Sequence, residues 1–115
     1  MFKLSHAQYE ALRARDSNQF VDVVCDQFLE SRPELAGVPG RTAIYDRMFG
    51  AFNFAKGLGF RSTPHVIRLM YLSADAPGIH ADPVVSAHLR RPGASPEQRL
   101  DDLLAVVRNK LKGMG

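Results

Sequence analysis

Cysteine is almost missing from this sequence, and tryptophan is missing altogether. Because Cys25 is the single cysteine, no disulfide can form within the chain, and nothing calls for an oxidising compartment. No apolar run approaches the ~20 residues that a membrane-spanning helix needs. The first residues also lack the apolar segment of a secretory signal. We therefore expect a cytoplasmic protein with no membrane partner.

An excess of one charge is lacking as well. The 15 Lys and Arg residues only slightly outnumber the 12 Asp and Glu residues, which gives a net charge of +3. The basic residues are spread along the chain with acids between them, whereas dedicated DNA-binding proteins gather them in one patch. This pattern disfavours nucleic acid as a partner.

Helical periodicity is the feature that the sequence has in abundance, and glycine and proline divide it into pieces. The spacing predicts helices over residues 5–31, 42–56, 62–73, 83–90 and 95–112, and no strand. Asp16, Ser17 and Asn18 are weak helix formers, so the first helix is expected to bend or break there. A chain of 115 residues has room for one domain with one core. We expect an all-α protein, a compact bundle of four to five helices in a single domain over residues 1–115.

Capping residues mark where the predicted helices begin. Ser5 is a plausible N-cap of the first helix, and either Ser62 or Thr63 caps the third. The last helix has the strongest signals, because Ser95 and Gln98 form a capping-box pattern around a proline in the first turn. Its expected apolar face consists of Leu100, Leu103, Leu104, Val107 and Leu111, and Lys110 and Lys112 suit its C-terminal end.

Two groups of residues could carry chemistry. His80, Asp82 and His88 are possible metal ligands, but their spacing matches no known ligand pattern, and Asp82 is better explained as a helix cap. Cys25 could pair with His6 or His65 as a nucleophile, but it lies in the apolar row of the first helix and is expected to be a buried hydrophobe. We therefore expect no catalytic residues, no metal and no cofactor.

The segment from Phe49 to Leu72 allows a helix-turn-helix interpretation, in which Arg68 lies on the second helix. A recognition helix should present several polar side chains to the bases, and this one offers little beyond His65 and Arg68. Ser62, Thr63, Pro64 and His65 are explained by helix capping. A small DNA-binding regulator is therefore a weak alternative.

Aromatic residues are concentrated in and just after the second predicted helix. Helical spacing places Phe54 off the face that Phe52 shares with Ile44, so this helix is apolar on more than one side. One interpretation is a central helix surrounded by its neighbours. The other is an exposed apolar strip for a partner. On the second interpretation, the expected contact residues are Phe49, Phe54, Phe60, Arg61 and Arg68.

Several short motifs follow one another in a specific order along the chain. They are Leu4-Ser5 with Gln8, Phe20, Arg32-Pro33-Glu34, Phe52 to Ala55 before Gly59, Val66 to Met70, Asp82-Pro83, Leu89, and Ser95-Pro96 through Arg99-Leu100 to Leu103. In this order the chain resembles a group of small helical proteins encoded beside effector and spike genes of bacterial type VI secretion systems. It lacks the tryptophan that follows Pro83 in that group.

The resemblance implies a role beside secreted effectors and assigns no catalytic residue. The preferred hypothesis is a non-catalytic adaptor or chaperone that binds an effector or spike protein. The alternatives are an immunity protein that neutralises a toxin and a small DNA-binding regulator. The first two hypotheses expect a protein partner and leave the oligomeric state open.

Overall fold

The computed structural model describes the backbone of residues 5–114 and the side chains of residue 5 and residues 7–106. Within these residues the chain is all-α, as predicted, and contains no strand. The helices are α1 (His6–Arg15), α2 (Ser17–Ser31), α3 (Arg41–Leu58), α4 (Thr63–Asp75), α5 (Pro83–Leu89) and α6 (Pro96–Met114). Two 3-10 turns, η1 (Pro33–Ala36) and η2 (Ile79–Ala81), lie between the predicted helices.

The described chain has six α-helices rather than the four to five expected, because the first predicted helix breaks at Asp16. The Asp16 backbone N–H donates to the Leu12 carbonyl at 2.8 Å and so ends α1. The Asp16 carboxylate accepts from the Gln19 backbone N–H at 3.1 Å and so caps α2. A side chain that bonds to the next turn competes with continuation of the helix.

Most of the predicted helix starts are confirmed. Ser5 forms a complete capping box with Gln8. The Ser95 hydroxyl accepts from the Gln98 N–H at 3.2 Å. Gly59 ends α3 in the left-handed conformation, with φ of 87°. Ser62 is the exception: it occupies the N-cap position of α4, but its hydroxyl makes no capping bond.

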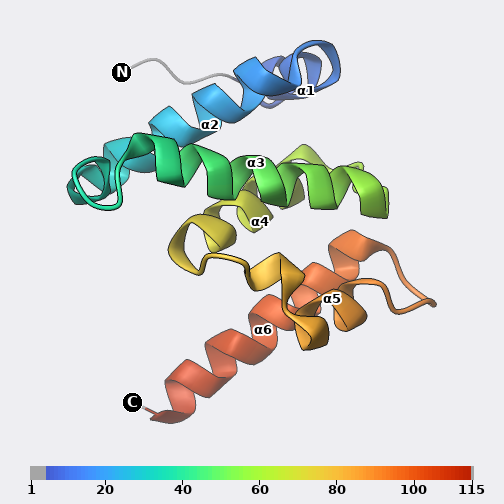
Figure 1. The fold of residues 1–115 in the computed structure, drawn as a ribbon. Helices are drawn as coiled ribbons and strands as arrows, with labels where there is room; N and C mark the ends of the chain where they lie inside the picture. The colour runs from blue at the N-terminus through green and yellow to red at the C-terminus, as the bar shows by residue number, and fades with distance from the viewer. Residues whose placement is uncertain (1–4, 115) are drawn as a thin grey trace.

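Helix α3 lies at the centre of the arrangement (Figure 1). It packs against α2 on one side and α4 on the other, and α1 also contacts α4. One core cluster takes residues from all six helices. Its largest fully buried hydrophobic side chains are Phe20, Ile44, Met48, Leu69, Met70 and Leu100. The position of α3 agrees with the prediction of a central helix surrounded by neighbours.

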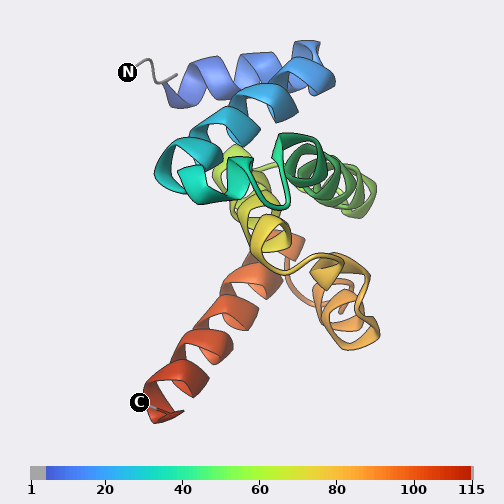
Figure 2. The same ribbon diagram turned by 60° about the vertical axis from the view of Figure 1, so that its left-hand side comes forward.

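Helix α6 diverges from the other helices along its length (Figure 2). Its first turns pack against α4 and α5, where Leu100 is fully buried. Leu103 and Leu104 are half-buried, and Val106 is already 55% exposed. The predicted roles of Val107, Lys110, Leu111 and Lys112 fall on side chains outside the described residues.

Leu100 is therefore expected to be the apolar anchor of α6. Leu100→Ala should lower the free energy of unfolding by about 2–5 kcal/mol, because it removes a fully buried side chain and leaves a cavity. Val106→Ala on the same helix should change it by no more than about 0.5 kcal/mol. Urea denaturation followed by circular dichroism measures both. Equal losses for the two variants would contradict this role.

Candidate functional site

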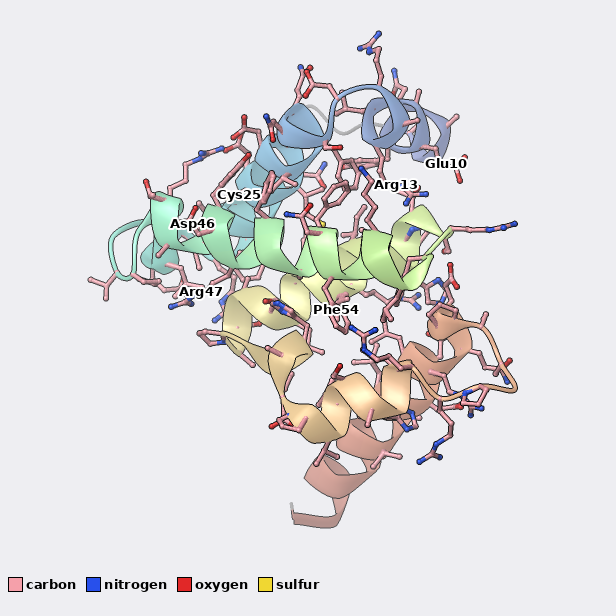
Figure 3. The ribbon with its side chains drawn as sticks, turned by 45° about the vertical axis from the view of Figure 1, so that its right-hand side comes forward. Glu10, Arg13, Cys25, Asp46, Arg47 and Phe54 are labelled. Carbon is pink, nitrogen blue, oxygen red and sulfur yellow. The ribbon has the colours of Figure 1, made fainter. Side chains whose placement is uncertain are left out.

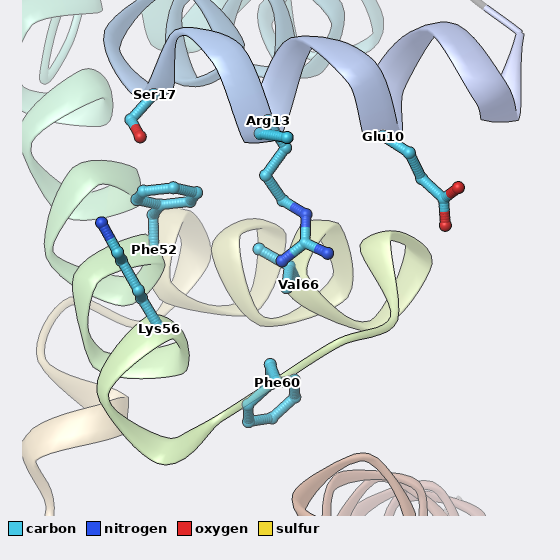
Figure 4. Close-up of a pocket in the computed structure, with 8 residues that line it drawn as sticks. Glu10, Arg13, Ser17, Phe52, Lys56, Phe60 and Val66 are labelled. Carbon is cyan, nitrogen blue, oxygen red and sulfur yellow. The ribbon is translucent and has the colours of Figure 1, made fainter.

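A surface cavity of about 310 Å³ lies where the end of α1, the end of α3 and the start of α4 meet. Its floor is apolar, because Phe52, Phe60 and Val66 line it and all three are buried. Arg13, Ser17 and Lys56 line its walls, and Figure 4 shows these side chains around the opening. Glu10 also lines the cavity, with its carboxylate directed away from Arg13 (Figure 4).

The Arg13 guanidinium is fixed by the segment that connects α3 to α4. Its Nε donates to the Thr63 hydroxyl at 3.1 Å, and its second terminal nitrogen donates to the Arg61 carbonyl at 2.8 Å. A guanidinium has five N–H donors in a rigid plane, so these two bonds orient the whole group. Arg13 is thus held in place on the cavity wall.

Two cations, Arg13 and Lys56, line the cavity together with the acid Glu10. Arg61, which follows Phe60, is exposed, and the Lys56 ammonium makes no hydrogen bond or ion pair within the described part of the chain. Other arginines bond to acids. Arg41 bonds to Asp22 and Asp26 at 2.9–3.1 Å, and these hydrogen bonds raise the pKa of its guanidinium. Arg32 bonds in the same way to Glu34 and Asp75.

The five predicted contact residues do not form one exposed strip. Phe60 belongs to the α3–α4 connection, packs into the core and is only 5% exposed. The expectation that its ring is exposed is therefore wrong. Phe49 is half-buried between the rings of Tyr45 and Phe52. Arg61 is exposed near the cavity, and Arg68 is exposed but pairs with Asp101 at 3.1 Å.

Phe54 lies on a different side of α3 and faces α5 (Figure 3). The centre of the His80 ring lies 5.3 Å from the centre of the Phe54 ring. The guanidinium of Arg90, the residue that follows α5, also lies 5.3 Å from the centre of the Phe54 ring. Phe54 is therefore half-buried between two other segments of the same chain. Its apolar surface is used for packing η2 and α5 onto α3.

The three residues considered as metal ligands lie in separate environments. His80 contacts Phe54 and lies 3.4 Å from the Ser73 hydroxyl, and the Asp82 carboxylate caps α5 through the N–H groups of Val84 and Val85. The cap confirms the prediction for Asp82. His88 Nε2 donates to the Arg99 carbonyl at 3.1 Å. No group of three potential ligands comes together among the described residues.

Cys25 is fully buried between α2 and α3 (Figure 3). Burial raises the pKa of its thiol, which disfavours the reactive thiolate. His65, one of its two candidate partners, is bonded to Ser62 and Asp101 instead, and the His6 side chain lies outside the described residues. The structure thus places Cys25 as a core residue.

A polar network that sequence reasoning assigned to capping joins α4 to α6. His65 Nε2 donates to the Asp101 carboxylate at 2.9 Å, which leaves Nδ1 to accept from the Ser62 hydroxyl at 2.6 Å. The residue types are those of a hydrolase triad, but there the serine bonds to Nε2 and the aspartate to Nδ1. All three residue types are visible in the sequence, but Ser62 and Asp101 lie too far apart along the chain for the sequence alone to predict that they meet at His65.

Glu97 of α6 accepts hydrogen bonds from the backbone N–H groups beside this network. Its carboxylate accepts from the N–H groups of Arg61 and Ser62 at 2.6 and 2.8 Å. An oxyanion hole needs free backbone N–H donors next to the nucleophile. Here the N–H groups of Arg61 and Ser62 already donate to the Glu97 carboxylate. The Ser62–His65–Asp101 arrangement therefore acts as an interhelical clamp.

The same clamp bears on the helix-turn-helix interpretation. Helix α4 packs against α1, α3 and α6, and Val66, Leu69 and Met70 on it are buried. Its two candidate base-reading side chains, His65 and Arg68, both bond to Asp101. A recognition helix needs such side chains free to enter a groove, so α4 lacks the expected exposure.

No protein-family model matches the chain, and neither curated proteins nor solved structures gave a significant match. Among the described residues, no helix combines the length and the hydropathy needed to cross a bilayer.

The contact of Glu97 with the α3–α4 connection can be tested through its pH dependence. Burial raises the pKa of this carboxyl, but the N–H groups of Ser62 and Arg61 outweigh it, and the net shift is downward. Its stabilising contribution is therefore present above the unfolded value of about 4.5 and is lost as the pH falls through the lower folded pKa. Glu97→Gln should be less stable than wild type near neutral pH, and the difference should shrink in acid.

The measurement is the urea midpoint of wild type and Glu97→Gln at a series of pH values. Asp102→Asn, an exposed carboxylate on the same helix, is the matched control and should leave the midpoint nearly unchanged. A stability difference between wild type and Glu97→Gln that stays constant down to strongly acidic pH would contradict this role of the Glu97 carboxylate.

His80 is expected to make the stability of the fold depend on pH in a second, higher pH range. Burial lowers its pKa from the ordinary value of 6.5, so the neutral ring is favoured in the folded chain. This stabilisation is present above about pH 6.5 and is lost as the pH falls through the lowered folded pKa. His80→Phe keeps a ring against Phe54 but cannot take up a proton. Its thermal midpoint should fall less than that of wild type between about pH 7 and pH 5.5, and an equal fall for both would contradict this role of His80.

Proposed function

We propose that this chain is a non-catalytic accessory protein that binds an effector or spike component of a bacterial type VI secretion system. The observation that carries the binding role is the cavity between α1, α3 and α4, which is lined by the fixed Arg13 and by Lys56, a lysine that pairs with no residue in the described part of the chain. The motif order of the sequence supports the assignment to this system.

The charges around the cavity favour a macromolecule. Arg61, which follows the lining residue Phe60, is an exposed cation that does not line the cavity itself. A small molecule that filled the cavity would leave Arg61 unused, whereas a protein surface would extend across it. Complementary charge at such a rim mainly guides association and selects the partner.

The polar groups of the chain that resemble a reactive site are already used for structure. Ser62, His65 and Asp101 join α4 to α6, and Glu97 takes the neighbouring backbone donors. These bonds support a role in which the chain offers a stable surface to a partner. The adaptor and immunity roles share this surface and differ in the identity of the partner.

Affinity purification from the native host tests the proposal. Tagged wild-type chain should recover an effector, toxin or spike protein, identified by mass spectrometry. Lys56→Glu should reduce the recovery by about tenfold, because it reverses a charge at the cavity without removing any described bond. Arg91→Glu, an equal charge reversal at an exposed residue that does not line the cavity, should keep the recovery.

The identity of the recovered protein separates the two roles. A spike or effector protein supports the adaptor role, and a toxin that kills the host when the gene is deleted supports the immunity role instead. If wild-type chain recovers no secretion protein, or if Arg91→Glu loses the partner as fully as Lys56→Glu, the proposal fails.

A further inference from the structure

His80 of η2 packs on α3 next to the Phe54 ring, and the centres of the two rings lie 5.3 Å apart. We infer that this contact is sensitive to pH: it keeps η2 on α3 near neutral pH, whereas mild acid releases η2 and exposes the side of α3 that carries Phe54. The inference concerns a local opening of the fold and does not depend on the proposed function.

A glycine in α3 makes room for the imidazole ring. A Cβ atom at Gly50 would lie 3.6 Å from both Cε1 and Nε2 of His80, so the ring packs directly on the helix backbone there. Phe54 follows Gly50 by one helical turn, and the ring therefore contacts α3 at two successive positions on the same side. This packing removes water from the ring and disfavours its charged form.

The hydrogen bonds around His80 suit the neutral ring. The Ser73 hydroxyl donates its single proton to the Arg47 carbonyl at 3.2 Å, so it can only accept from His80 Nδ1, which lies 3.4 Å away. The neutral ring therefore carries its proton on Nδ1. A second proton would be added at Nε2, which lies beside Gly50 and bonds to no residue in the described part of the chain.

No carboxylate on the helices around η2 is bonded to His80. The acids there are Asp46 of α3, Asp75 of α4 and Asp82 at the start of α5. Asp75 bonds to Arg32, and Asp82 accepts from the first N–H groups of α5. Asp46 is exposed and makes no bond to the ring. A charged His80 would therefore have no counter-ion among the described residues.

The neighbouring basic groups do not favour the charged ring either. They are Arg47 of α3, and His88 and Arg90 in and directly after α5. Arg47 and His88 bond to backbone carbonyls. The Arg90 guanidinium lies 5.3 Å from the centre of the Phe54 ring, so a charged His80 would be a second cation on that ring.

The opening of η2 is therefore expected to depend on pH. With η2 in place, burial lowers the pKa of His80 from the usual value of 6.5, and exposure to water after opening restores that value. The open form consequently takes up a proton at a higher pH than the closed form. Opening becomes more favourable as the pH falls below about 6.5, and the increase levels off below the lowered pKa of the closed form.

The opening stays local because α5 is held separately. Val85 and Leu89 of α5 are buried in the core. In η2, by contrast, Ile79 and His80 are only half-buried, and Gly78 precedes the turn in the left-handed conformation, with φ of 77°. A short turn with few buried contacts opens at lower cost than a core helix does.

Hydrogen exchange of the full chain, followed by NMR, measures the opening. The backbone N–H groups of Ala81 and Asp82 donate within the turn at 2.9 and 3.2 Å, so their exchange rates report on η2. Corrected for the intrinsic effect of pH, their exchange should increase at least about threefold from about pH 7.5 to about pH 5.5, while Met48 in the middle of α3 keeps its protection. His80→Phe keeps a ring against Phe54 but cannot titrate, so it should abolish the increase.

Two glycines of α3 provide matched variants. Gly50→Ala brings a methyl group against the His80 ring, whereas Gly57→Ala adds the same group with no side chain or other segment within 4 Å. Both substitutions should raise the thermal midpoint, because alanine has the higher helix propensity. Only Gly50→Ala should slow the exchange of Ala81 and Asp82 at about pH 5.5, by about twofold or more, since the methyl group adds packing that opening must break.

Three results would overturn the inference. The first is an acid-dependent increase in exchange that is absent from η2 or is as large at Met48 as in η2. The second is an increase that persists in His80→Phe. The third is equal exchange of η2 in Gly50→Ala and Gly57→Ala at about pH 5.5.

Discussion

The connection between α3 and α4 is the point on which the site depends, because it is held from two opposite directions. Arg13 of α1 donates to the Arg61 carbonyl and the Thr63 hydroxyl, while Glu97 of α6 accepts from the Arg61 and Ser62 N–H groups. A short connection with its backbone groups bonded to charged side chains on both sides is stabilised by stronger bonds than neutral pairs provide. Phe60, buried within the same connection, adds the apolar contact to the core.

This arrangement explains why the cavity has its particular lining. The same Arg13 that fixes the connection also forms one cavity wall, and the same Phe60 that anchors the connection forms part of the floor. If α6 moved away, the Glu97 carboxylate would leave the connection, and the backbone N–H groups of Arg61 and Ser62 would lose their acceptor. The cavity, the connection and the position of α6 are therefore coupled through a few hydrogen bonds.

The sequence predicted the helices well because their signals are local. Glycine, proline and capping residues mark helix starts within a few positions, and the break at Asp16 followed from three weak helix formers. The predicted number of helices was too low because a bent helix and two separate helices show the same local pattern of weak helix formers. Whether Asp16 caps a new helix depends on its side chain reaching Gln19, which composition alone does not decide.

The site was less predictable because its residues come from distant parts of the chain. Arg13 meets Thr63 across 50 positions, and His65 meets Asp101 across 36. Phe54 and Phe60 were expected at one surface, yet helical periodicity gave only the direction of each ring and not the segment that would cover it. The covering segments turned out to be η2 and α5 for Phe54 and the core itself for Phe60.

The distribution of ion pairs connects these observations to binding. Arg41 on α3 and Arg32 before η1 bond to acids of α2, η1 and α4, so their charge is used within the fold. Lys56 at the cavity has no such partner among the described residues, and a cation without a counter-charge costs little at the surface, where water solvates it. Arg13 on the cavity wall is already oriented before any partner arrives, because its hydrogen bonds to Thr63 and Arg61 form on folding.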